Sequence, residues 1–86
     1  MAYENAILEE RQSTHGDYSD TAEAAQQLKR VCQRIRGNTE WTDVQKESLD
    51  LICTKIARLV SGDPNHKDSW DDIAGYAELA SLRLGG

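Results

Sequence analysis

The stretch from Thr42 to Pro64 constrains the fold of this chain more than any other, because it carries a complete set of signals for one long helix. Thr42 is followed three residues later by Gln45, which forms a capping box that satisfies two backbone N–H groups of a first helical turn. Gly62 and Pro64 then supply the signals for a helix end. The segment therefore predicts a helix over residues 43–61, at the centre of the fold.

This helix has two dissimilar faces when its residues are placed about 100° apart. One face is apolar and is expected to enter the core; it contains Leu49, Ile52, Cys53, Ile56, Leu59 and Val60. The opposite face is mostly polar and contains Glu47, Asp50, Thr54, Ala57, Arg58 and Ser61. Lys55 lies on the border. Polar side chains on a core helix indicate a binding task, so this face directs the search for a site.

Two helices are expected before it. A short one is predicted over residues 3–12, and a second from a capping-box-like start at Asp20 and Glu23 to about Arg36. Gly37 is expected to end the second helix. Its apolar stripe is predicted to contain Ala25, Leu28, Val31, Cys32 and Ile35.

The last helix is predicted to begin around Asp68, where acidic residues suit the positive end of the helix dipole. Its buried stripe is expected to contain Trp70, Ile73, Ala77, Ala80 and Leu84. Short connections make neighbouring helices antiparallel. The chain is therefore expected to be all-α, a small antiparallel bundle of about four helices in a single domain over residues 1–86.

Size and charge set further limits. A chain of 86 residues is near the lower limit for a stable core, so we expect a homo-oligomer. A net charge of −5 argues against binding to duplex nucleic acid. The first residues lack a signal sequence and no apolar run could span a membrane, so a cytoplasmic protein without a membrane partner is expected. Cys32 and Cys53 are expected to be buried thiols in a reducing compartment.

Carboxylates at helical spacing form the first candidate site. Glu47 and Asp50 are three residues apart, and this spacing recurs seventeen intervening residues later at Asp68 and Asp71. Such pairs on facing helices suit Mg²⁺, which takes oxygen ligands from carboxylates and from substrate phosphates. The alternative is that Glu47 is a solvated charge and that Asp68, Asp71 and Asp72 only complement the helix dipole.

Cations form the second candidate site. Arg58 offers a planar fork of donors that matches phosphate oxygens, Lys55 adds a point charge, and His15 can present a ring nitrogen beside a glycine turn. The alternative is structural: Arg58 would then form an ion pair with Asp50 or Asp72, and His15 would be a capping or exposed residue.

Aromatic side chains complete the candidate site. A ring beside a cationic patch can stack on a nucleobase, and Tyr18, Tyr76, Trp41 and Trp70 are available for this. Packing in the core or at an interface is the alternative, and it is the expected role of Trp70, which lies on the apolar stripe.

Three blocks of the sequence resemble an uncharacterised family of short phage and prophage proteins: HGDY at residues 15–18, KIARL at 55–59 and DSWDDIAGYA at 68–77. More distantly, the chain resembles phage nucleotide-modification-associated domains and the all-α NTP pyrophosphatases of the MazG type. The MazG signature is Glu-x-x-Glu, a spacer and Glu-x-x-Asp. Here Asp50 and Asp68 replace two of its glutamates, and their shorter side chains set the oxygens back. The resemblances imply a phage protein that handles nucleotides.

These observations predict a phage-encoded binding module, without catalysis or cofactor, that captures a nucleotide or cyclic nucleotide, with a host immune signal as one candidate. The predicted ligand-binding residues are His15, Asp17, Tyr18, Lys55, Arg58, Asp72 and Tyr76. The first alternative is a Mg²⁺-dependent nucleotide pyrophosphohydrolase with Glu47, Asp50, Asp68 and Asp71 as metal ligands. The second is a protein that binds and inhibits a host enzyme. A requirement for metal distinguishes the first two.

Overall fold

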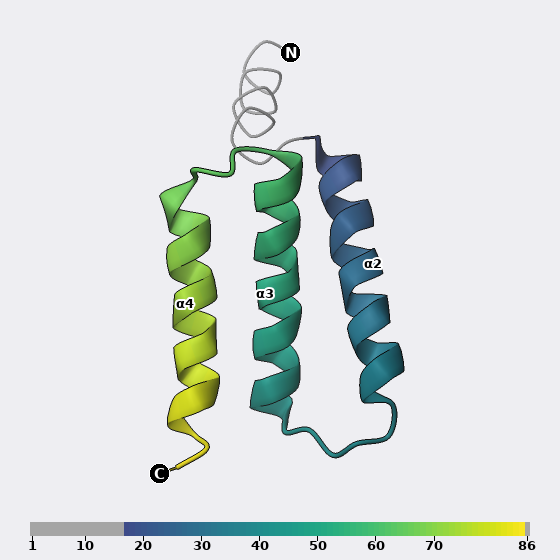
Figure 1. Ribbon diagram of the computed structural model, residues 1–86, viewed down its shortest axis with the longest axis vertical. Coiled ribbons are helices and arrows are strands. Elements are labelled where there is room, and N and C mark those ends of the chain that lie inside the picture. Colours follow the sequence, from purple (N-terminus) through teal and green to yellow (C-terminus); the bar gives the residue numbers. More distant parts are fainter. Residues whose placement is uncertain (1–16, 86) are drawn as a thin grey trace, which may run out of the picture.

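The computed structural model describes residues 17–85, which form three antiparallel helices (Figure 1). They are α2 (Tyr18–Arg36), α3 (Asp43–Ser61) and α4 (Lys67–Leu82). The all-α class is confirmed for this part of the chain, which contains no strand. The helix predicted over residues 3–12 lies outside the described residues. Oligomerisation remains a prediction. None of the described helices is long and apolar enough to cross a membrane.

The three helices lie side by side in one layer, with α3 in the middle (Figure 1). α2 and α4 each pack on α3 and not on each other. The burial of α3 reflects this arrangement. Ala57 is 0% exposed and Ser48 is 8% exposed, although these residues are nine positions apart and therefore lie on opposite sides of the helix. α3 thus buries two opposite flanks, and it leaves two open faces between them.

Local signals set the helix ends. The predicted capping box of α3 is confirmed: the Gln45 N–H donates to Thr42 Oγ1 at 3.1 Å, and the Thr42 N–H donates to Gln45 Oε1 at 2.9 Å. The predicted end of α2 is also confirmed, because the N–H of Gly37 donates to Gln33 O at 3.0 Å. Gly37 has φ of 55°, a value that glycine adopts without strain.

The predicted starts of the other two helices need correction. α2 begins at Tyr18 with Asp17 as its N-cap residue, so Asp20 lies in the first turn instead of forming a capping box. Any acid near a helix start suits the dipole, which is why Asp20 alone could not fix the boundary. α4 begins at Lys67, one residue before the predicted position, with His66 at its N-cap.

Small and polar side chains hold the layer together. Between α2 and α3, the hydroxyl groups of Thr21 and Ser61 are 2.6 Å apart, and Ala25 and Cys53 are buried. Between α3 and α4, the buried residues are chiefly Leu59, Ser48 and Ser69, and Ser69 is only 2% exposed. Small side chains allow helix backbones to approach closely, so the tightest contacts do not involve the largest apolar residues.

Several residues predicted to be buried are exposed. Val60 is 70% exposed, Ile35 76% and Trp70 55%, and Leu84 lies beyond α4 in contact with solvent. Ala57, assigned to the polar face from the sequence, is instead fully buried. A single apolar stripe is the pattern of a helix with one buried side, whereas α3 has two. The indole N–H of Trp70 donates to Pro64 O at 2.8 Å, so this ring is held over the α3–α4 connection.

The capping box gives a prediction about stability. Thr42→Ala removes the side-chain oxygen that accepts the Gln45 N–H, and it should lower the free energy of unfolding by about 1 kcal/mol. Urea unfolding followed by circular dichroism measures this. Thr39→Ala is the matched control, because Thr39 is an exposed threonine of the same connection with no part in the cap. Equal losses in the two variants would contradict the assignment.

The buried thiol of α3 makes stability depend on pH. Burial raises the pKa of Cys53 to about 11, and the neighbouring Cys32 thiol and Asp50 carboxylate act in the same direction. Above pH 9.0, the ordinary thiol pKa, the unfolded chain loses this proton while the folded chain keeps it. The unfolded state then binds fewer protons, so the free energy of unfolding should fall as pH rises from 9.0 towards 11.

Urea unfolding at pH values on both sides of 9.0 tests this. The decline in the free energy of unfolding should be smaller in Cys53→Ala than in the unmodified chain. Cys32→Ala, which keeps the buried thiol, should retain most of it. An equal decline in all three proteins would show that other groups are responsible.

Candidate functional site

One of the two open faces of the layer is polar. On α3, four side chains lie within about 80° of one another on the helical wheel and define what we call the polar face: Glu47, Asp50, Thr54 and Arg58. Glu47 and Arg58 lie away from the flanks that contact α2 and α4, whereas Asp50 falls between Ala57 and Ser61 on the wheel and borders the α2 flank. The sequence grouped these residues correctly. Their place in the fold follows from the middle position of α3, which leaves this side uncovered within the described chain.

Lys55 joins the polar face to α4. Its Nζ lies 2.9 Å from Asp72 Oδ2, and the two side chains are 15% and 45% exposed. This ion pair crosses between helices and fixes the register of α4 on α3. The alternative considered from the sequence was an ion pair of Arg58 with Asp50 or Asp72. In the structure, Asp72 pairs with Lys55 instead. Both Lys55 and Asp72, predicted as ligand residues, are therefore already neutralised by each other.

Arg58 is the notable cation of the polar face. It is half-buried, and within residues 17–85 its side chain makes no hydrogen bond or ion pair. Asp50 is also half-buried and lies near the Cys53 thiol, and its carboxylate makes no ion pair or hydrogen bond in the same range. A guanidinium that has lost part of its hydration without gaining an acidic partner is well suited to bind an anion.

Tyr76 borders two shallow hollows on the same side of the layer, one between α3 and α4 and one on the surface of α4 alone. One has a volume of about 360 Å³ and is lined by residues that include Glu47, Leu51 and Tyr76. The other, of about 440 Å³, includes Asp72 and Tyr76. Tyr76 is half-buried and contributes to both. The predicted residues Asp72 and Tyr76 are thus brought together, with Glu47 close by.

The other predicted ligand residues lie at one end of the layer or outside the described residues. Asp17 is the N-cap residue of α2 and accepts a hydrogen bond from the Ser19 hydroxyl. Tyr18 is 81% exposed. Because Thr21 contacts Ser61, this end of α2 lies next to the end of α3, one turn beyond Arg58. His15 lies outside the described residues.

The predicted metal ligands do not converge in one chain. With Asp72 opposite Lys55 in antiparallel helices, Glu47 and Asp68 are separated by about 18 Å along the helix axes. Asp71 accepts a hydrogen bond from Lys67 Nζ at 2.7 Å, and this contact raises the pKa of that ammonium. Within the described residues, no three His, Cys, Asp or Glu side chains form a group that could hold a metal.

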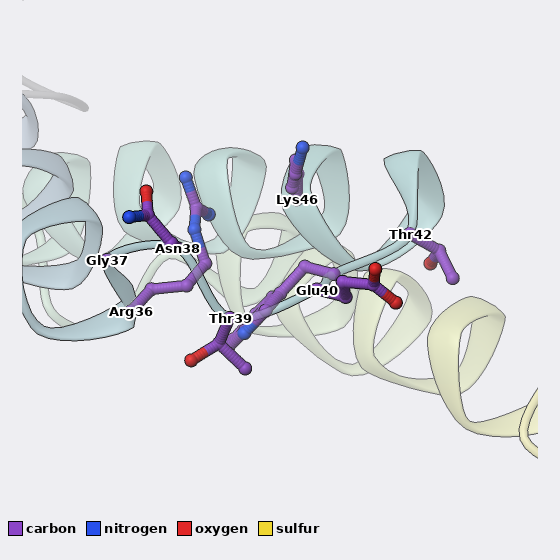
Figure 2. Close-up of a pocket in the computed structure, with 8 residues that line it drawn as sticks. Arg36, Gly37, Asn38, Thr39, Glu40, Thr42 and Lys46 are labelled. Atoms are coloured by element: carbon purple, nitrogen blue, oxygen red, sulfur yellow. The ribbon is translucent and has the colours of Figure 1, made fainter.

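A third pocket, not predicted from the sequence, lies at the α2–α3 connection. It has a volume of about 590 Å³, and its lining includes Arg36, Asn38, Trp41 and Lys46. Figure 2 shows Arg36, Asn38 and Lys46 extending to one side of the connection, while Thr39 points to the other. The Arg36 guanidinium lies 5.4 Å from the centroid of the Trp41 ring, a cation–π contact.

The composition of this connection carried a signal for the pocket. Arg36 and Lys46 flank Trp41 in the sequence, each five residues away. A tryptophan in a loop between two cations is a signal for a cation–π contact. Since Arg36 already contacts the ring, the pocket has one engaged cation and one exposed cation, Lys46. We expect it to bind anions more weakly than Arg58, which is half-buried and has no partner within residues 17–85.

Comparison with known proteins identifies the family of this chain but no activity. Residues 2–83 match a family described as a domain of unknown function, DUF6378, which covers most of the chain. No curated protein and no solved structure gives a significant match. The resemblance to phage proteins and to MazG-type pyrophosphatases therefore stays a prediction. The chain belongs to the DUF6378 family of domains of unknown function.

Proposed function

We propose that this chain binds a small phosphate-bearing ligand, a nucleotide or cyclic nucleotide, on the polar face and leaves it chemically unchanged. The observation that carries the proposal is the half-buried guanidinium of Arg58, which has no acidic partner within residues 17–85. A phosphate would supply the missing partner through two parallel N–H···O bonds. Binding of this kind needs no nucleophile, general base or metal.

The position of Tyr76 supports a ligand that also has a ring. Tyr76 follows Asp72 by one helical turn, so in the register fixed by Lys55 it lies opposite Leu51, and both residues line the smaller hollow. Leu51 and Arg58 are seven residues apart in α3, which is about 10 Å along the axis. A nucleoside phosphate can span that separation, with its phosphate on Arg58 and its base against Tyr76.

The charges along α3 favour one orientation of the bound ligand. Glu47 lies roughly 16 Å from Arg58 along the axis, in the same hollow as Tyr76. A carboxylate repels phosphate but accepts hydrogen bonds from hydroxyl and amino groups. We therefore place the phosphate at the Arg58 end and the base or sugar near Glu47. Of the acids that lie between these two ends, Asp72 is neutralised by its ion pair with Lys55, whereas Asp50 forms no ion pair within residues 17–85.

Removal of Arg58 should abolish binding. The purified chain is incubated with a panel of nucleoside triphosphates and of cyclic mono- and dinucleotides, with and without Mg²⁺, and bound ligand is measured by native mass spectrometry. We expect Arg58→Ala to lose the ligand that the unmodified chain retains. Because the Arg58 side chain makes no ion pair in the described chain, circular dichroism should show unchanged helicity.

Two further variants make the result specific. Arg58→Lys keeps the charge but not the fork of donors, so it should bind more weakly than the unmodified chain and better than Arg58→Ala. Lys46→Ala removes a cation of the same helix that lines the α2–α3 pocket, and it should bind normally. Loss of binding in Lys46→Ala alone would move the site to that pocket. Loss of helicity in Arg58→Ala would show a structural role instead.

The released ligand separates the remaining alternatives. Recovery of an intact nucleotide without metal supports the proposal. Mg²⁺-dependent conversion to a monophosphate would replace it with a pyrophosphohydrolase. A complete absence of bound nucleotide would reject it and leave a protein partner as the better hypothesis.

A further inference from the structure

We propose that the second open face of the layer is the contact surface between two copies of this chain, related by a twofold axis with their α2 helices antiparallel. Five large apolar side chains are exposed on this side, and we call it the apolar face: Val31 and Ile35 of α2, Ile56 and Val60 of α3, and Trp70 of α4. The proposal is independent of the ligand, because it concerns the side of the layer opposite to Arg58.

Helix geometry places these five residues on one side. In α3, Ile56 and Val60 lie about 160° and 200° from Arg58 around the axis, which is the reverse of the polar face. In the antiparallel neighbours, the same construction puts Val31 and Ile35 of α2 and Trp70 of α4 on that side, whereas Leu79 and Leu82 of α4 lie away from it. All three helices therefore contribute large apolar side chains to this side, with Val31 and Ile35 towards one end of the layer and Ile56, Val60 and Trp70 towards the other. A monomeric protein rarely exposes such a set on one side.

The size of this open side fits a second folded layer. Three helices packed about 9 Å apart, each about 24–28 Å long, give the whole side, polar residues included, a projected area of roughly 700 Å². A standard interface buries about 800 Å² on each partner. A single helix, with a diameter of about 10 Å, would cover about a third of this face.

Charges along α2 favour a second copy over an unrelated partner. Asp20 and Glu23 lie in its first half and Arg30 and Arg34 in its second, all exposed, within about 80° around the helix and along the margin of the apolar face. None of the four makes an ion pair within residues 17–85. Asp20 and Arg34 are equidistant from Gln27, and Glu23 and Arg30 are centred between Gln26 and Gln27.

This arrangement is self-complementary only when two α2 helices run in opposite directions. Glu23 then faces the partner's Arg30, and Asp20 faces the partner's Arg34, with each pair formed twice across the axis. A twofold contact uses the same patch on both copies, so a pattern that complements itself is what such an interface requires.

The test is the mass of the full chain in solution, measured by sedimentation equilibrium or by light scattering during size-exclusion chromatography. The unmodified chain should be a dimer. Val60→Glu and Ile35→Glu should each raise the dissociation constant by more than about tenfold, because an unpaired carboxylate would be placed in an apolar contact. Leu82→Glu is the matched control: this leucine is 69% exposed at the end of α4, away from the apolar face, and the mass should not change.

Charge reversal tests whether the two α2 helices are antiparallel, and it leaves the apolar residues unchanged. Glu23→Arg should weaken the dimer, and Glu23→Arg combined with Arg30→Glu should restore it, because the pair is then re-formed with opposite signs. Both positions are exposed, so these variants should fold even if Val60→Glu does not. A monomeric unmodified chain, a dimer that tolerates Val60→Glu and Ile35→Glu, or a double variant without recovery would each overturn the proposal.

Discussion

The double packing of α3 determines the rest of the structure. This helix contacts α2 on one flank and α4 on the opposite flank, and the outer helices do not reach each other. A layer of three helices has no enclosed centre, so its core is divided into two seams, one on each side of α3. The two open faces then follow from geometry, and the sequence of α3 makes one of them apolar and the other polar.

The chemistry of the two seams explains why so few large residues are buried. Ala57, Cys53 and Ala25 fill the α2 seam, where the Thr21 and Ser61 hydroxyl groups also meet. Two nearly buried serines lie in the α4 seam, and the ion pair between Lys55 and Asp72 crosses it. Close approach of small side chains gains dispersion contacts over a narrow strip only. A chain of this size that also exposes large apolar side chains has most to gain from burying them against a partner.

Short-range features were predictable because their signals are local. The hydrogen bonds of Thr42 with Gln45 and the end of α2 at Gly37 involve residues within one turn of each other, and both were read correctly. Burial was predicted less well, because a helical wheel assumes one buried side. Ala57 is buried instead of exposed for that reason. Trp70 lies on α4, which packs on α3 alone, and it is exposed because it lies about 100° around that helix from the buried Ser69. The polar face was predicted, since periodicity groups its residues. The partner of Asp72 was not, because the choice between Lys55 and Arg58 depends on the register of two helices.

The division of the core into two seams also has a consequence for folding. Each outer helix is connected to α3 by a short loop and packs on α3 alone, so the chain consists of two helical hairpins that share one helix. Almost all of its packing lies between sequence neighbours, which is the condition for rapid folding and for partial opening of one hairpin while the other persists. Energetic effects in α2 and α4 should then be additive, as in repeat proteins, where stability is the sum of neighbouring contacts. Amide hydrogens of α3 would exchange last, because α3 is released only when both hairpins have opened.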